Sequence, residues 1–262
     1  MEFDPADLER AVETVRARLA EVPAHVARVR GATAMAVGMP LLPDPVVTAI
    51  VETVEHVVSS AIRIAATVEE LLEGVAAPVT MFSYARGWVD IKSMATGVQG
   101  TLRVDQLSAK AHWKGVAADR YATAIATQSG AAGRVAAVAG NAAIALSTCA
   151  GAALLFYVAL GVIIVQLLAG LIAAAAAVLS EVFSWAGLLA ALADIEITAA
   201  QLVALVTSLT TLLGAQALWM INLRGELLDH SQFPGGRWPS AVAATYMDAT
   251  VTDGDAKWSI AT

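Results

Sequence analysis

The side chains that could carry out chemistry are few and widely spaced. Cys149 is the single cysteine and lies inside a long uncharged stretch, so we expect a buried and inert thiol. The four histidines are scattered and lack the spacing of a zinc or iron site. Asp253 and Asp255 flank one glycine, but the further oxygen ligands of a calcium loop are missing from their neighbourhood. We therefore predict no metal ion.

Recognisable catalytic and cofactor motifs are also missing from the sequence. It contains no G-x-S-x-G nucleophile turn, no H-E-x-x-H zinc motif, no phosphate-binding loop and no G-x-G-x-x-G dinucleotide motif. The prediction is a protein that is not an enzyme, with no catalytic residues and no cofactor. Its function must then come from packing, assembly or surface contact.

The composition favours helices and excludes one class of partner. The chain has 262 residues, of which 58% are hydrophobic, 6% aromatic and 15% charged, and most of the apolar residues are alanine, valine and leucine. Such a composition is typical of closely packed helices rather than of an aromatic-rich β core. The net charge of −7 opposes phosphate binding, so we expect no nucleic-acid partner. The fold class is predicted to be all-α.

Residues 1–78 are predicted to form a helical hairpin. Asp4 followed by proline is a helix start, and the acidic beginning M-E-F-D-P-A-D differs from a secretory signal, which would be basic there. Apolar residues then recur in alternating steps of four and three, which indicates a helix that packs on another helix. We expect Pro23 to kink or split this helix, residues 31–45 to form a loop, and a second helix to end at Gly74.

Residues 79–134 are predicted to form a second hairpin. A helix over about 80–110 is followed by Trp113-Lys-Gly115, which we interpret as a tight turn in which Gly115 supplies backbone freedom. A further helix begins with the small residues after this turn. The two hairpins together would form a four-helix-bundle-like front, with each hairpin covering the apolar stripe of the other.

The turn carries a resemblance to a known family. The segment W-K-G-V-A-A-D-R-Y-A, which contains Trp113, Gly115, Asp119 and Tyr121, resembles the W-x-G turn of the WXG100 superfamily. The extended form is similar to mycobacterial type VII (ESX) secretion-associated proteins of the EspA/EspE type, and residues 1–78 more loosely resemble EspC-like partner proteins. The resemblance implies that these four residues are structural recognition elements in a secreted or envelope-associated protein of an actinobacterium.

One element of the family pattern is missing. Those systems are read through a Y-x-x-x-[DE] signal, whereas the four tyrosines here are followed four residues later by tryptophan, isoleucine, glycine and threonine. By resemblance, either a small WXG100-like or EspC-like partner carries the signal, or this chain is not an exported substrate. Fusion of both members of a normally two-chain pair in residues 1–134 is a further hypothesis.

Residues 135–223 are predicted to form a long hydrophobic helical hairpin. Residues 135–180 and 197–223 are two uncharged runs of 46 and 27 residues, and about 20 apolar residues suffice to cross a bilayer. Trp219 and Arg224 would be an interfacial anchor and a flanking charge. The simplest interpretation is two transmembrane helices with both termini on the cytoplasmic side.

A soluble alternative remains open for the same hairpin. It could be buried in a helical bundle or a homo-oligomer and insert into a membrane later. The predicted connector, residues 180–196, carries Glu181, Asp194 and Glu196. Protonation of these hairpin-tip acids would ease insertion at low pH, while the simpler interpretation is a solvated polar turn. Residues 224–262 form a polar tail, in which residues 233–239 are expected to be a docked proline and glycine loop.

The predicted function is that of a non-enzymatic type VII secretion-associated protein. It would act by helical self-assembly and membrane interaction, and it could form pores, filaments or rings. The alternative is a constitutive two-pass inner-membrane protein whose front is a cytoplasmic helical docking module.

Overall fold

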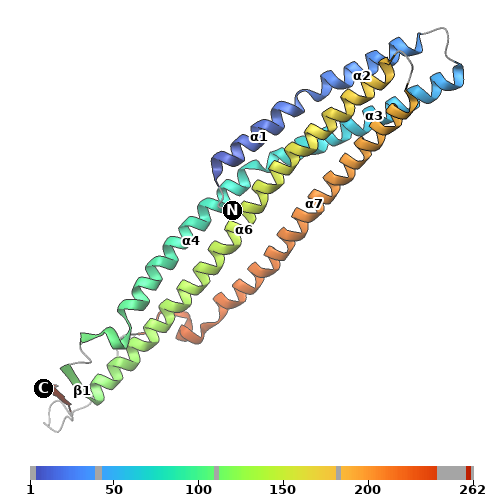
Figure 1. The fold of residues 1–262 in the computed structure, drawn as a ribbon. Coiled ribbons are helices and arrows are strands. Elements are labelled where there is room, and N and C mark those ends of the chain that lie inside the picture. Colours follow the sequence, from blue (N-terminus) through green and yellow to red (C-terminus); the bar gives the residue numbers. More distant parts are fainter. Residues whose placement is uncertain (1–3, 39–42, 109–111, 181–183, 241–257, 261–262) are drawn as a thin grey trace. The chain divides into compact units, whose positions relative to one another are not determined.

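The fold is all-α and is built from long helices joined by short connections (Figure 1). A computed structural model of the chain describes residues 4–38, 43–108, 112–180, 184–240 and 258–260. Outside the helices, the described residues include two three-residue strands and four short 3₁₀ segments. The predicted fold class is therefore confirmed.

The first two helices follow the local signals of the sequence. Helix α1 covers Pro5–Leu19, and its N-terminus is capped by Asp4, whose carboxylate accepts a hydrogen bond of 2.9 Å from the Ala6 amide. Helix α2 covers Val22–Val37 and has Pro23 in its first turn. The expected split at Pro23 is confirmed, because proline is tolerated in a first turn but not in a helix interior.

The next two helices are joined by a shorter connection than the sequence indicated. Helix α3 covers Asp44–Leu71, a 3₁₀ turn η1 covers Leu72–Val75, and helix α4 covers Ala76–Thr101. The expected loop over 31–45 is wrong in its first part, because α2 continues through Gly31 to Val37. The helix expected over about 80–110 instead begins at Ala76 and ends at Thr101.

Two very long helices make up most of the second half of the chain. Helix α6 covers Val116–Leu179 and helix α7 covers Trp185–Leu228. The connector was expected over 180–196, but α7 already begins at residue 185, so this expectation is wrong. A run of good helix formers extends the helix through the acidic residues, since a few charges do not stop a helix that keeps an apolar face.

The short elements lie at the ends of these helices. The 3₁₀ turn η2 covers Val104–Gln106, η3 covers His230–Gln232 and η4 covers Pro234–Gly236. Strand β1, Trp113–Gly115, pairs antiparallel with strand β2, Trp258–Ile260, in a register that places Lys114 opposite Ser259.

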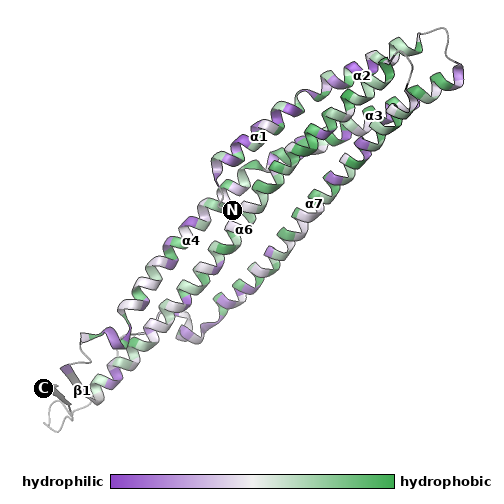
Figure 2. Cartoon of the chain, viewed as in Figure 1, coloured by the Kyte–Doolittle hydropathy of each residue, from purple (hydrophilic) through white to green (hydrophobic). Residues whose placement is uncertain are grey.

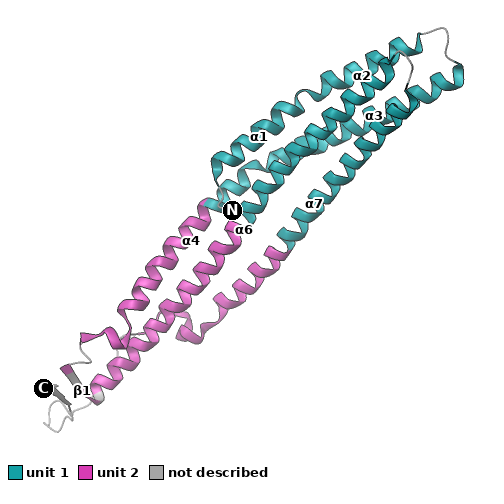
Figure 3. Cartoon of the chain, viewed as in Figure 1, with its two compact units in different colours: residues 1–82, 148–214 teal, residues 83–147, 215–262 magenta. Residues whose placement is uncertain are grey.

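The chain divides into two compact units that do not follow the four segments expected from the sequence (Figure 3). Unit 1 combines residues 1–82 with 148–214, and unit 2 combines residues 83–147 with 215–262. The expected boundaries at 78, 134 and 223 follow changes in composition. The units instead follow packing, so α4, α6 and α7 each contribute one part to each unit.

Unit 1 contains the main hydrophobic core. Its buried residues come from α1, α2, α3, the second half of α6 and the first half of α7, and the fully buried ones include Val15, Val57, Leu160 and Leu188. Figure 2 shows the strongly hydrophobic second half of α6 that supplies much of this core. The N-terminal hairpin is therefore covered mainly by residues 150–209, and Met81 and Phe82 of the predicted second hairpin also pack against this core.

Close approach of α6 and α7 in unit 1 depends on a residue without a side chain. A Cβ atom at Gly170 would lie 2.9 Å from Ile195 Cγ1, closer than real Cβ contacts. Ile195 is fully buried. The hydrophobic hairpin expected from the sequence is thus present here, with its two arms in direct contact.

Unit 2 has a smaller core and more polar contacts. Val138, Ala142 and Leu223 form its buried cluster, with Trp88 and Trp219 packed against it. The buried amide of Gln128 donates a hydrogen bond of 3.0 Å to the Pro239 carbonyl. This bond attaches the loop that ends at Pro239 to α6, as expected of a docked loop.

Candidate functional site

The W-x-G segment lies directly before α6, but it is not the expected tight turn. Residues Trp113–Gly115 are the strand β1, and Gly115 has a φ of 105°. That region of backbone conformation favours glycine, so the expected role of Gly115 is confirmed although the segment is extended. Pairing with β2 replaces the turn, since a short strand gains backbone hydrogen bonds from a neighbour that is distant in sequence.

The other two W-x-G residues occupy the start of α6. Asp119 lies in the first turn of the helix, where a carboxylate is favourable beside the positive end of the helix dipole. Tyr121 follows in the next turn and is half-buried. The structure thus groups Gly115, Asp119 and Tyr121 at one helix start in unit 2.

Two of the three predicted hairpin-tip acids, Asp194 and Glu196, do not lie at the tip of the hairpin. Glu181 lies outside the described residues, whereas Asp194 and Glu196 lie inside α7. The expectation of a solvated polar turn is wrong for Glu196, because its carboxylate contacts side chains of α3. Asp194 is on the exposed surface of the same helix.

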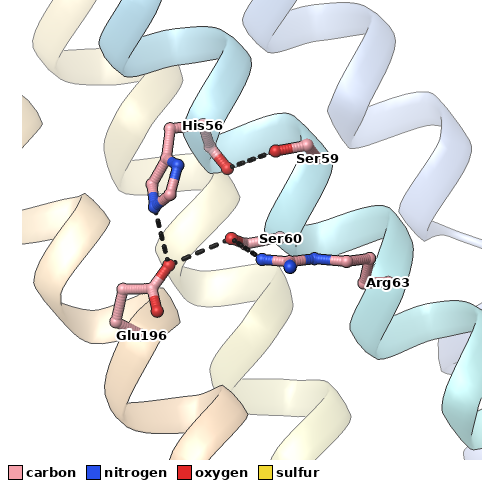
Figure 4. A network of polar contacts seen from close by, with 5 residues as sticks. All are labelled: His56, Ser59, Ser60, Arg63 and Glu196. Carbon is pink, nitrogen blue, oxygen red and sulfur yellow. Dashed lines mark hydrogen bonds and ion pairs between the residues drawn. The ribbon is translucent and has the colours of Figure 1, made fainter.

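Glu196 is the centre of a polar network between α3 and α7 (Figure 4). Its Oε1 lies 3.1 Å from His56 Nε2 and accepts a hydrogen bond of 3.0 Å from the Ser60 hydroxyl. Arg63 Nη2 lies 3.0 Å from Ser60 Oγ and donates to it. Ser60 is only 1% exposed, while the Glu196 side chain is 47% exposed, so the network lies at the border between core and solvent.

Serine, histidine and a carboxylate occur here together, but their order is not that of a catalytic triad. In a triad the histidine contacts the serine hydroxyl and removes its proton, and the carboxylate orients the histidine. Here Glu196 contacts both His56 and Ser60, and the hydroxyl is buried away from any substrate. The network of Glu196, His56 and Ser60 instead links α3 to α7, and we call it the clamp.

A second network, which the sequence reasoning missed, lies in unit 2. Arg134 donates a hydrogen bond of 3.0 Å to the Glu226 carbonyl, and its guanidinium lies 3.7 Å from the carboxylates of Glu226 and Asp229. Arg134 directly precedes the 46-residue uncharged run, and the sequence does not show which carboxylates it meets.

Asp229 is the carboxylate of this network that also accepts a hydrogen bond from a backbone amide. Its Oδ1 accepts a hydrogen bond of 3.0 Å from the Ser231 amide at the start of η3. That backbone hydrogen bond, with a smaller contribution from the Arg134 charge, lowers the pKa of Asp229 below its ordinary value.

Other chemistry-bearing side chains form no site. Within the described ranges, no group of three or more histidine, cysteine, aspartate or glutamate side chains could hold a metal ion. The aspartates at 253 and 255 lie outside those ranges. Cys149 is buried in α6, as expected of an inert thiol.

Long apolar helices are a further feature of the chain. Among the described residues, three helical stretches are long and apolar enough to cross a membrane: Asp44–Thr101, Ala117–Leu179 and Trp185–Gln232. The sequence indicated the second and third and missed the first. In the most apolar window of Ala117–Leu179, 56% of the residues are buried inside the protein, so other helices already cover much of it.

Unit 1 also has an apolar groove of about 660 Å³ beside α2 and α3. Arg30 and Glu69 contribute its charged groups, and the remaining walls are apolar. The apolar lining residues include Leu19, Val22, Val26, Ile62 and Ala65.

Comparison with known proteins gives no relative from which a role could be transferred: no protein-family model, curated protein or solved structure matches the chain.

Proposed function

We propose that this chain is a non-enzymatic type VII (ESX) secretion-associated protein that acts by helical self-assembly and membrane interaction. The observation that carries the proposal is the W-x-G segment. It stands directly before a long helix, with Gly115 at a positive φ and with Asp119 and Tyr121 in the first turns of that helix. These are the positions at which the sequence resembles the WXG100 superfamily.

The apolar helices support the second half of the proposal. Three stretches of sufficient length and apolarity give the chain the means to associate with a membrane. A secreted or envelope-associated location, an actinobacterial source and a small helical partner belong to the same proposal.

Secretion of W-x-G variants tests the proposal. The full chain and its Trp113→Ala variant are expressed in an actinobacterial host with an active type VII system, and both are quantified in culture filtrate and in cells. We expect the ratio of cell-associated to secreted protein to be at least tenfold higher for the variant than for the wild type. Trp238→Ala, which removes an exposed tryptophan of the tail, is the matched control and is expected to be secreted normally. Equal export of Trp113→Ala and wild type would contradict the proposal.

A second candidate is a constitutive two-pass inner-membrane protein with a helical docking module. The lengths of α6 and α7 favour it, because both arms of the hairpin can cross a bilayer. Alkaline carbonate extraction separates the candidates. A chain that stays in the carbonate-resistant membrane pellet and yields no detergent-free soluble species supports the two-pass protein. A soluble species supports the secretion-associated protein.

A further inference from the structure

The second half of α6 leaves one regular apolar stripe exposed. Between residues 155 and 179 the exposed residues recur in alternating steps of three and four, and the only other exposed positions in this range are Gln166 and Ala173. The stripe carries no charge. We call it the α6 stripe; it consists of Leu155, Val158, Val162, Val165, Ala169, Ile172, Ala176 and Leu179.

The spacing of the stripe keeps its residues on one face of α6. Alternating steps of three and four follow the turn of the α-helix, so a second helix can lie along the whole stripe. The large residues Leu155, Ile172 and Leu179 are each at least half exposed and alternate with the small Ala169 and Ala176, which would let a second helix approach closely.

The surface beside the stripe has the shape for a helix partner. A groove of about 380 Å³ lies between α1 and α6, with Ala11 and Thr14 of α1 on one side and Val158, Val162 and Val165 of the stripe on the other. Side chains of a facing helix can insert into such a hole, as knobs do in coiled coils.

Charges on α1 oppose a bilayer on this face. On the helix row of Ala11 and Thr14, Asp7 lies one turn before and Arg18 one turn after, and each forms an ion pair at the protein surface, with Arg10 and Glu21 respectively. Acyl chains in contact with the stripe would also meet these charges, which are unfavourable in the hydrocarbon region. At a protein interface the same charges lie at the rim, where they remain hydrated.

We propose that the α6 stripe is the surface through which two copies of this chain associate, with the stripe of one copy packed against the stripe of the other. An uncharged row of leucine, valine, isoleucine and alanine is complementary to itself, as a two-fold interface between identical subunits requires. This proposal rests on the proposed function and deepens it, because it assigns self-assembly to a particular surface.

The experiment compares two adjacent positions of the same helix. Ile172→Glu places a charge in the stripe, and Ala173→Glu places the same charge at an exposed position just outside it. Purified full-length proteins are measured by size-exclusion chromatography with light scattering in detergent-free buffer. We expect wild type and Ala173→Glu to have at least twice the 27.0 kDa mass of one chain, and Ile172→Glu to have at most half of the wild-type mass.

If purification requires detergent, cysteine crosslinking replaces the mass measurement as the test of association. In a Cys149→Ser background, Val165→Cys in the stripe is expected to give a covalent dimer with a short bismaleimide. Thr207→Cys, an exposed position on α7, is expected to stay monomeric. Circular dichroism checks that each variant keeps its helix content.

Each remaining outcome overturns the proposal. A wild-type monomer, an unchanged mass of Ile172→Glu, or equal crosslinking from both cysteines would show that the stripe is not the interface. A monomer that floats with vesicles of phosphatidylglycerol and phosphatidylethanolamine, and loses flotation on Ile172→Glu, would assign the stripe to lipid. Retention of Trp113→Ala in the secretion assay does not depend on these results, so failure of the interface and failure of the proposed function are distinguishable.

Discussion

Glu196 illustrates how a single carboxylate can couple two helices that are distant in the sequence. Its contacts with His56 and Ser60 join α7 to α3 across 136 residues of chain. Ser60 is a polar group inside an apolar environment, and such groups need hydrogen-bond partners. The carboxylate therefore satisfies a buried hydroxyl.

Removing this carboxylate should destabilise unit 1. We expect Glu196→Ala to lower the free energy of unfolding by about 1–3 kcal/mol, because it takes an acceptor from the buried Ser60 hydroxyl and the contact from His56. Asp194→Ala, two residues away on the exposed surface, should change it by less than about 0.5 kcal/mol. Urea denaturation followed by circular dichroism measures both. Equal effects of the two variants would show that the clamp does not stabilise the fold.

Asp229, which follows the last residue of α7, makes the stability of the folded protein depend on pH. Its pKa is lowered in the folded protein by the Ser231 amide and by Arg134, so the ionised carboxylate is favoured by folding. The stabilisation is present above the unfolded pKa, near 3.9 for an aspartate, and is lost as the pH falls through the folded value.

We therefore expect Asp229→Asn to unfold at a lower temperature than the wild type at pH 6, and the difference to shrink as the pH approaches about 3. Thermal unfolding monitored by circular dichroism between these pH values makes the comparison. A difference that is constant over the whole range would contradict the prediction.

At the scale of elements, the junction before α6 depends on the backbone of one residue. Gly115 has a φ of 105°, between a paired strand and the first residue of a helix. A side chain at this position is strained whatever space surrounds it. Gly97 is an ordinary helical residue of α4 and has no heavy atom within 4 Å of an added Cβ.

Alanine should accordingly have opposite effects at these two glycines. Gly115→Ala is expected to destabilise the protein by about 1–3 kcal/mol, and Gly97→Ala is expected to stabilise it by about 0.5–1 kcal/mol. Differential scanning calorimetry of the two variants under identical conditions measures the sign. A stabilising Gly115→Ala would mean that the positive φ is not required for the fold.

At the scale of the whole molecule, neither unit is a continuous piece of sequence. The core of unit 1 takes one wall from residues 1–82 and the other from residues 148–214. The apolar stripes of α1 and α3, including the fully buried Val15 and Val57, therefore lose part of their cover when the second half of α6 is removed.

For this reason the fragment 1–134 should not fold as an independent bundle. We expect it to unfold without a cooperative transition and to bind a hydrophobic dye such as ANS, as compact states without fixed packing do. The full chain, in the same buffer or in mild detergent, is expected to unfold cooperatively. A sharp thermal transition for the fragment would support the four-helix front expected from the sequence and contradict the packing in unit 1.

Features that depend on neighbours along the chain could be predicted from the sequence alone. Asp4 and Pro5 start α1, Pro23 separates α1 from α2, and the uncharged runs give the long arms of α6 and α7. Gly115 was correctly identified as a position that needs glycine. Caps, prolines, glycines and apolar periodicity act over a few residues, so they can be read locally.

Which helix faces pack against one another is known only from the packing of the folded chain. An apolar stripe shows that a helix face is buried, but any other apolar stripe can cover it, because the hydrophobic effect has no direction. The sequence could not show that residues 150–209 cover most of the N-terminal hairpin, that Glu196 contacts Ser60, or that β1 pairs with β2. It also could not show that the α6 stripe stays uncovered, since exposure is a property of the packed chain and not of the residues alone.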